Sequence, residues 1–205
     1  MNINDFSALS FAYFEFSIGE IENFLRKDIE NDLESQRISL TKNVFNIEQY
    51  FSGAIDKRNP QKKPYAKPTL EAFFYSPSSS PEKTIMVSNM RDGWIQLCRV
   101  LSKTLKCRYY YFLMDDDLFD EPGNYFESGD GVSTRTVYAI KEDKWVFCSI
   151  GDAVSIEDVQ HYKKRNIKDR LNKQILIEYC QKLDLSIFDD NFWQSESEGL
   201  RYVIG

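Results

Sequence analysis

The fold class is decided by the stretch Trp94-Ile-Gln-Leu-Cys-Arg-Val-Leu-Ser-Lys-Thr-Leu-Lys-Cys-Arg-Tyr-Tyr-Tyr-Phe-Leu-Met114. In its first half, apolar residues recur at spacings of three and four, which predicts one buried face of a helix that ends near Lys106. The side chains of Ser88–Asp92, just before this helix, are suited to cap its start. From Cys107 onward the aromatic residues are consecutive, which predicts a strand. A helix therefore leads directly into a strand.

The chain before this stretch predicts further strands and another helix. The aromatic residues of Leu9–Ile18 indicate a strand, although this strand is apolar on both faces. After Gly19, apolar residues at helical spacing lie opposite acidic ones, which predicts an amphipathic helix. Residues 37–45 alternate between apolar and polar, as a strand does. The runs Leu70–Tyr75 and Lys83–Ser88 are separated by a turn-rich segment and predict a hairpin.

The chain after the central stretch predicts a second hairpin and a third helix. The hairpin joins Val132–Ile140 to Lys144–Ile150. The helix carries an apolar stripe from Ile167 to Leu183, and its basic residues are interpreted as a solvated face. Two short elements follow, and the second of them, Leu200–Ile204, fits an edge strand.

Together these elements predict a single α+β domain over residues 1–205. Its antiparallel sheet is expected to be flanked by about three helices, near Ile21, Trp94 and Leu171. The segment at about 56–68 holds three prolines and five basic side chains. It is expected to be a loop, because proline can neither donate to a sheet ladder nor continue a helix. A chain of this size can bury a core without disulfides or metals.

The charge balance limits the classes of partner. The 26 lysines and arginines and 32 acidic residues give a net charge of −6, and the pI is about 5.0. On average such a chain repels nucleic acids and anionic membranes and favours a basic protein. The start of the chain lacks the basic and apolar pattern of a secretory signal, and no segment has the roughly 20 apolar residues of a membrane helix. We therefore expect a cytoplasmic protein that binds neither nucleic acid nor membrane.

The reactive residue types point away from catalysis. The cysteines Cys98, Cys107, Cys148 and Cys180 form no C-x-x-C pair, and His161 is the single histidine. This argues against a zinc site and for buried thiols in a reducing compartment. The chain contains neither the nucleophile motif G-x-S-x-G nor the glycine-rich phosphate loops. We expect no catalytic residues, metal or cofactor.

The acidic run Asp115-Asp-Asp-Leu-Phe-Asp-Glu121 is the most suggestive polar feature. Crowded carboxylates can bind Ca²⁺ or Mg²⁺, but the spacing excludes an EF-hand. A solvated loop is the simplest interpretation, and a protein-docking patch is the main alternative. Nearby Leu118 and Phe126 favour docking, since apolar anchors within a charged rim are typical of interfaces. The predicted partner-binding residues are Asp115, Asp116, Asp117, Phe119, Asp120, Glu121 and Tyr125.

The order of elements around Gly93-Trp94 resembles a known family. A helix that opens on this pair, the aromatic strand from Cys107, and the runs Thr136–Ile140 and Lys144–Phe147 together look like the small immunity proteins of bacterial toxin systems. The resemblance covers residues 84–170. It implies an acidic, cytoplasmic α+β protein that neutralises a cognate toxin domain, often a basic nuclease, by direct binding. No family motif here fixes particular binding residues.

Two other function classes stay open. An enzyme could use the acidic run Asp115–Glu121 as a metal site, in which case the protein should bind a divalent cation. A structural or adaptor module could form a homodimer through an apolar edge, in which case its mass should depend on concentration. A gene for a basic toxin beside this one would favour an immunity protein over both.

Overall fold

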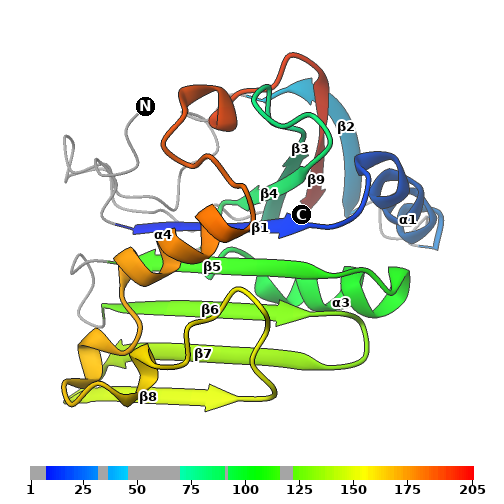
Figure 1. The fold of residues 1–205 in the computed structure, drawn as a ribbon. Helices are drawn as coiled ribbons and strands as arrows, with labels where there is room; N and C mark the ends of the chain where they lie inside the picture. The colour runs from blue at the N-terminus through cyan, green and yellow to red at the C-terminus, as the bar shows by residue number, and fades with distance from the viewer. Residues whose placement is uncertain (1–7, 32–36, 46–69, 91, 116–121) are drawn as a thin grey trace.

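The fold is a nine-stranded antiparallel sheet with helices on both faces (Figure 1). The structure is a computed structural model, and it describes residues 8–31, 37–45, 70–90, 92–115 and 122–205. Within these ranges the strand order is β2-β9-β3-β4-β1-β5-β6-β7-β8. This arrangement confirms the predicted α+β class, with its antiparallel sheet and three flanking helices.

The strands and helices have the following bounds. The strands are β1 (Ala8–Phe14), β2 (Ile38–Val44), β3 (Leu70–Tyr75), β4 (Thr84–Ser88), β5 (Tyr109–Asp115), β6 (Gly123–Gly129), β7 (Thr134–Lys141), β8 (Trp145–Ile150) and β9 (Glu198–Ile204). The α-helices are α1 (Ile18–Asn31), α3 (Ile95–Leu105) and α4 (Lys173–Lys182), and the short 3₁₀ helices are η2 (His161–Lys163), η3 (Ile167–Asp169) and η4 (Asp190–Trp193).

The central strands are buried on both faces of the sheet. On one face Phe11 of β1 packs in a cluster with residues of α4 and η4. On the other face Phe14 of the same strand packs in a cluster with residues of α1 and α3. Figure 1 shows α4 crossing one face while α3 lies on the other. Because successive side chains of a strand point to opposite faces, a strand between two helical layers must be apolar throughout. This explains why apolar and aromatic residues dominate Leu9–Phe14 on both faces, with Ser10 as the one exception.

Several predicted elements are confirmed. The strand predicted over Leu9–Ile18 is β1, but it ends at Phe14 and Ile18 already begins α1, the helix predicted after Gly19. Residues 38–44 form β2. The hairpins appear as the antiparallel pairs β3–β4 and β7–β8. The helix α3 covers most of the predicted span and leads into β5. The proline-rich and lysine-rich segment at about 56–68 lies outside the described residues.

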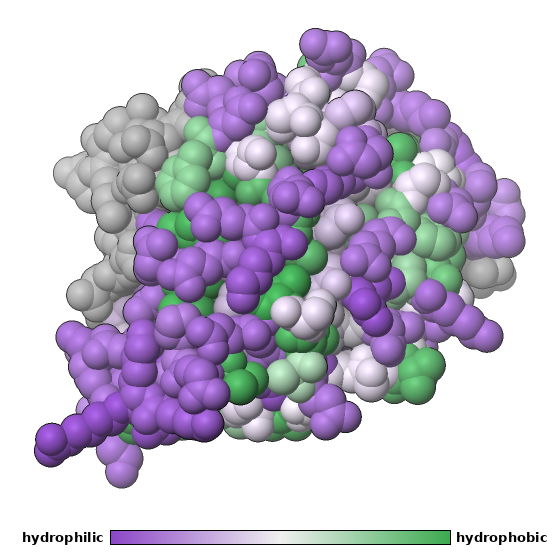
Figure 2. All heavy atoms as spheres, in the orientation of Figure 1, coloured by the Kyte–Doolittle hydropathy of each residue, from purple (hydrophilic) through white to green (hydrophobic). Residues whose placement is uncertain are grey.

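The third predicted helix is shorter than its apolar stripe suggested. It begins at Lys173 because the Asn172 side chain accepts a hydrogen bond from the Ile175 N–H at 3.0 Å and caps the helix there. The preceding apolar residue Ile167 lies on the 3₁₀ helix η3 instead. The basic residues from Lys163 to Lys168 are exposed around these short elements, where the molecular surface is strongly hydrophilic (Figure 2). They do not form one helical face.

Two strands differ from the sequence interpretation. The C-terminal strand β9 is not an edge strand, because it lies between β2 and β3 and bonds to both. The residues after Pro122 form β6, which the sequence had suggested only as part of a docking loop. In β6 Phe126 is fully buried beneath α4, with its ring centroid 5.3 Å from that of Tyr179, so it cannot be an exposed anchor.

Two further predictions concern buried thiols and membrane-spanning segments. All four cysteines are free; Cys98, Cys107 and Cys180 are buried, and Cys148 is half-buried. None of the helices in the described part of the chain combines the length and apolar composition needed to cross a bilayer.

We expect Trp94→Ala to lower the free energy of unfolding by about 3–5 kcal/mol. Trp94 immediately precedes α3, is only 9% exposed, and stacks on Tyr202 of β9 with ring centroids 5.8 Å apart. The substitution therefore opens a cavity between α3 and the sheet. Trp94→Phe keeps an aromatic ring in place and should lower the free energy of unfolding by less. Denaturant titration followed by circular dichroism measures both, and a wild-type midpoint for Trp94→Ala would contradict this packing role.

Candidate functional site

The predicted acidic patch is described at two of its seven positions. Asp115 ends β5 and Tyr125 lies in the neighbouring strand β6. Asp115 is only 4% exposed, so it is not part of a solvated loop. The other predicted residues, Asp116, Asp117, Phe119, Asp120 and Glu121, lie outside the described residues.

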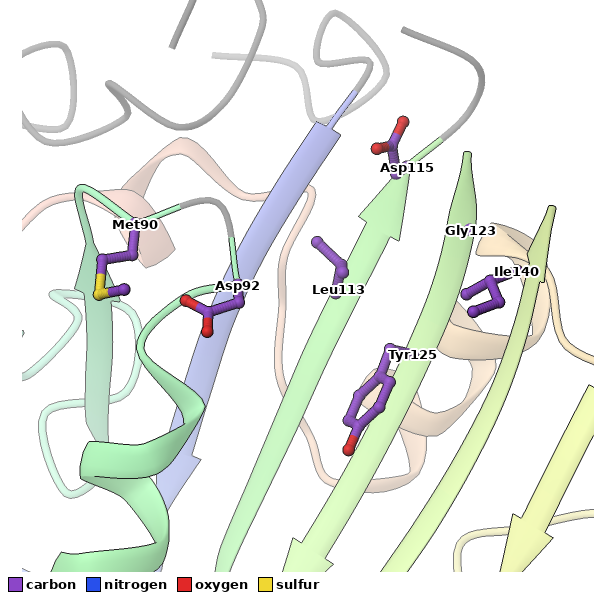
Figure 3. Close-up of a pocket in the computed structure, with 7 residues that line it drawn as sticks. All are labelled: Met90, Asp92, Leu113, Asp115, Gly123, Tyr125 and Ile140. Carbon is purple, nitrogen blue, oxygen red and sulfur yellow. The ribbon is translucent and has the colours of Figure 1, made fainter. Parts of the chain in front are cut away.

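Asp115 and Tyr125 both line a pocket of about 370 Å³ (Figure 3). Its wall also includes residues that the sequence analysis did not assign to a site. Among the described residues, the lining consists of Met90, Asp92, Leu113, Asp115, Gly123, Tyr125 and Ile140. We call this cavity the acidic pocket, because two carboxylates share its wall with four apolar or aromatic side chains.

The sheet register builds the floor of the acidic pocket. Leu113 of β5 lies opposite Tyr125 of β6, and Ile140 of β7 lies opposite Gly123. A Cβ atom at Gly123 would lie 2.5 Å from the Cγ2 of Ile140, so any larger residue would push the Ile140 side chain away. Gly123 thus allows Ile140 to lie close against β6 and form one wall.

A tight turn before α3 places the second carboxylate. Gly93 and Trp94 have φ values of 61° and 58°, in the left-handed region, and this turn reverses the chain into the helix. The Asp92 Oδ1 accepts a hydrogen bond from the Trp94 N–H at 3.0 Å, which holds the Asp92 side chain at the turn. A Cβ at Gly93 would lie 2.6 Å from Cε2 of Tyr111, so glycine is needed there. Figure 3 shows Asp92 near Leu113 and Asp115 at the end of the same strand.

A buried network beside the acidic pocket holds Tyr125 in place. The Tyr125 hydroxyl donates to Glu127 Oε2 at 2.6 Å, and Arg99 of α3 donates to both Glu127 oxygens at 2.7 and 2.6 Å. The Tyr109 hydroxyl donates to Oε1 of the same carboxylate at 2.5 Å. Glu127 is fully buried, so these bonds satisfy a charge that would otherwise be costly.

The network also sets the protonation of its members. Burial by itself raises the pKa of Glu127, but the hydrogen bonds from Arg99, Tyr109 and Tyr125 outweigh it, and the pKa lies below its ordinary value. Burial and the bond to Glu127 raise the pKa of Tyr125 well above its ordinary value. Tyr125 therefore stays a neutral phenol that donates to an ionised Glu127.

The chemistry of the acidic pocket suits a cation with an apolar stem. Lysine and arginine side chains can lay their methylene groups on apolar surface while their charged ends reach carboxylates. An arginine could also place its guanidinium over an aromatic ring such as Tyr125. Among the residues that the structure describes, no three His, Cys, Asp or Glu side chains form a cluster that could hold a metal ion.

The sequence contained part of the signal for this site. Leu113 and Asp115 stand two positions apart in a strand and therefore share a face. Asp92 was predicted only as a possible helix cap, but the N-cap of α3 is Trp94, whose side chain makes no capping hydrogen bond; Asp92 instead holds the preceding turn by accepting from the Trp94 N–H. Its place at the acidic pocket depends on the contact between α3 and β5. Met90 and Ile140 carry no local signal. The register of β6 and β7 brings Ile140 to the acidic pocket, and Met90 reaches it from the turn that follows β4.

We expect Glu127→Gln to lower the free energy of unfolding by about 1–3 kcal/mol at neutral pH, because it weakens buried bonds to a charged acceptor. The folded-state pKa is depressed, so the charge stabilises the fold fully above the unfolded pKa of about 4.3. That stabilisation is lost as the pH falls through the lower folded-state pKa.

Denaturant titrations from neutral pH to about pH 3 test this expectation. The difference in stability between wild type and Glu127→Gln should shrink as the pH falls. Glu30→Gln removes an exposed carboxylate on α1 and serves as the control, which should keep the wild-type profile. An unchanged difference across the whole range would contradict an ionised Glu127.

Comparison of the chain with models of protein families, with curated proteins and with solved structures gives no match. The geometry of the acidic pocket and the charge of the chain are therefore the observations on which a function is proposed.

Proposed function

We propose that this protein is a cytoplasmic immunity protein that binds and neutralises a basic toxin domain through the acidic pocket. The observation that carries the proposal is the meeting of Asp92 and Asp115 with the apolar walls formed by Leu113 and Tyr125. A lysine or arginine of the partner enters this pocket, with its stem on the apolar wall and its charge near the carboxylates. The resemblance around Gly93-Trp94 supports the choice of a toxin as the partner.

The charge of the chain supports a basic partner. The net charge of −6 attracts a basic domain over distances of about a Debye length. The predicted residues Asp116, Asp117, Asp120 and Glu121 belong to the same acidic run of the sequence as Asp115 and contribute to the negative charge of the chain. Such charges mainly raise the rate of association, and they act less at high salt.

The rigid surroundings of Tyr125 support a role as an interface anchor. Its hydroxyl is fixed by Glu127, and its ring stacks on Tyr138 with centroids 6.0 Å apart. A ring that is already ordered before binding loses little conformational entropy when a partner packs on it. Contacts of this kind lower the rate of dissociation more than they change the rate of association.

The test begins with a search for a gene of a basic toxin beside the gene of this chain and measures the interaction with its product. Co-expression of this protein should restore growth to cells that the toxin kills, and the purified pair should form a complex. Asp92→Asn should slow association by about 3- to 10-fold at low ionic strength and by much less at high ionic strength. Leu113→Ala should mainly speed dissociation, because it removes apolar wall without changing charge.

The matched control is Glu30→Gln, which removes the same charge from α1, away from the acidic pocket. It should associate nearly as fast as the wild type. Replacement of Asp116, Asp117 and Asp120 together by asparagine tests the acidic run. Phe119→Ala tests the predicted anchor in that run. If the neighbouring basic protein binds all these variants like the wild type, the acidic pocket is not the interface. If co-expression gives no protection, the immunity function is wrong.

A further inference from the structure

Among the strands that the structure describes, β8 forms one edge of the sheet, and none of them pairs with its outer side. It follows β7 at the end of the strand order, and Figure 1 shows no described element beyond it. The Lys141 N–H donates to the Pro122 carbonyl, next to β6, at 2.9 Å. In an antiparallel ladder every second residue bonds to the same neighbour, so the backbone groups of Lys141, Ala139 and Val137 face β6. By alternation, Thr136, Tyr138 and Ile140 of β7 bond to β8 instead.

The same alternation identifies the backbone groups on the free side of β8. The residues opposite those three positions of β7 are Val146, Cys148 and Ile150, so their backbone groups face β7. The backbone N–H and C=O groups of Phe147 and Ser149 therefore point away from the sheet. They form a row of donors and acceptors that another strand can pair with.

The sequence of β8 lacks the features that normally protect a sheet edge. Edge strands usually carry a charged side chain, a proline or a bulge that discourages pairing. The opposite edge strand, β2, contains Lys42. The strand β8 reads Trp145-Val-Phe-Cys-Ser-Ile150 and has neither a charge nor a proline, and Ile150 is 59% exposed. An open edge of this composition favours a partner strand.

The charges that flank β8 indicate which strand pairs there. Lys144 precedes the strand and Asp152 follows it, both are exposed, and each lies four positions from Cys148. Two copies of β8 that pair antiparallel about Cys148 direct Lys144 of each copy toward the end of the other strand, where Asp152 follows the left-handed turn at Gly151. In the same register Val146 lies opposite Ile150, so apolar residues meet between the two charged ends. The strand is therefore complementary to itself.

We propose that β8 pairs with β8 of a second copy of this chain, so that a homodimer forms around a two-fold axis at Cys148. The outward backbone groups of Phe147 in one copy bond to those of Ser149 in the other. In this dimer the Cys148 residues of the two copies lie opposite each other as a non-hydrogen-bonded pair, in which side chains are close. The proposal is independent of the acidic pocket, which no residue of β8 lines.

The first test measures mass by sedimentation or light scattering at several concentrations. Wild type should reach twice the chain mass of 24.1 kDa as the concentration rises. Ser149→Pro removes an outward N–H without removing a bond to β7, and it should shift the protein to the monomer. Ser149→Ala keeps that N–H and should dimerise like the wild type. A monomeric wild type at every concentration overturns the proposal.

The charge exchange tests the register and does not depend on a proline that could disturb folding. Lys144→Asp places like charges together and should weaken the dimer at least several-fold, and so should Asp152→Lys. The double variant Lys144→Asp with Asp152→Lys restores the opposite charges and should recover dimerisation. Failure of this recovery, when both single variants are weakened, overturns the antiparallel register about Cys148.

Oxidative cross-linking locates the interface. With copper phenanthroline as the oxidant, the two Cys148 thiols should form an intermolecular disulfide, because the other three thiols are buried. Cys148→Ser should remove the cross-linked species and leave the mass of the non-covalent dimer unchanged. A dimer that forms equally well in Ser149→Pro and gives no Cys148 cross-link uses another surface and overturns the proposal.

Discussion

The structure depends on the pairing of β1 with its two neighbours. On one side β1 pairs with β5 along its whole length, from Ala8 opposite Asp115 to Phe14 opposite Tyr109. On the other side it pairs with β4, and so it joins β2, β9, β3 and β4 to the meander β5–β8. Without β1, the sheet divides into two parts. Because both helical layers cover it, every side chain of β1 must tolerate burial.

The elements that local sequence predicts are those whose pattern reflects local contacts. The β7–β8 hairpin joins segments adjacent in the chain, and α3 shows its buried stripe directly. The position of β9 could not be predicted, because its neighbours β2 and β3 lie far away in the sequence. The strand β6 was missed because it holds two glycines and Glu127, residues typical of loops. Burial of Glu127 becomes acceptable only when Arg99, Tyr109 and Tyr125 surround it.

The candidate site also has a part that local sequence predicts and a part that long-range contacts determine. The sequence identified Asp115 and Tyr125, since one belongs to a dense acidic run and the other to a cluster of aromatic residues. Ile140 lines the same pocket because of the register of three strands, and Asp92 lines it because of where α3 docks. The interpretation of these residues as one exposed loop failed for the same reason. Pairing of β5 with β6 buries Asp115 and fixes Tyr125 in a strand.

An incomplete helical layer on the α3 side of the sheet accounts for the acidic pocket and leaves apolar side chains of β8 uncovered beside its open backbone edge. On the α4 side, alternate residues of β7 such as Val137 and Ala139 are fully buried. On the other side α3 packs on β5 and reaches β6 through Arg99, while Tyr138 and Ile140 of β7 are only half-buried. The acidic pocket lies where this cover ends, and β8 lies beyond it. A sheet wider than its helical layer leaves apolar surface that the described residues do not bury, and such surface is typical of binding sites. In this protein carboxylates flank that surface at the acidic pocket, and self-complementary charges flank it at β8.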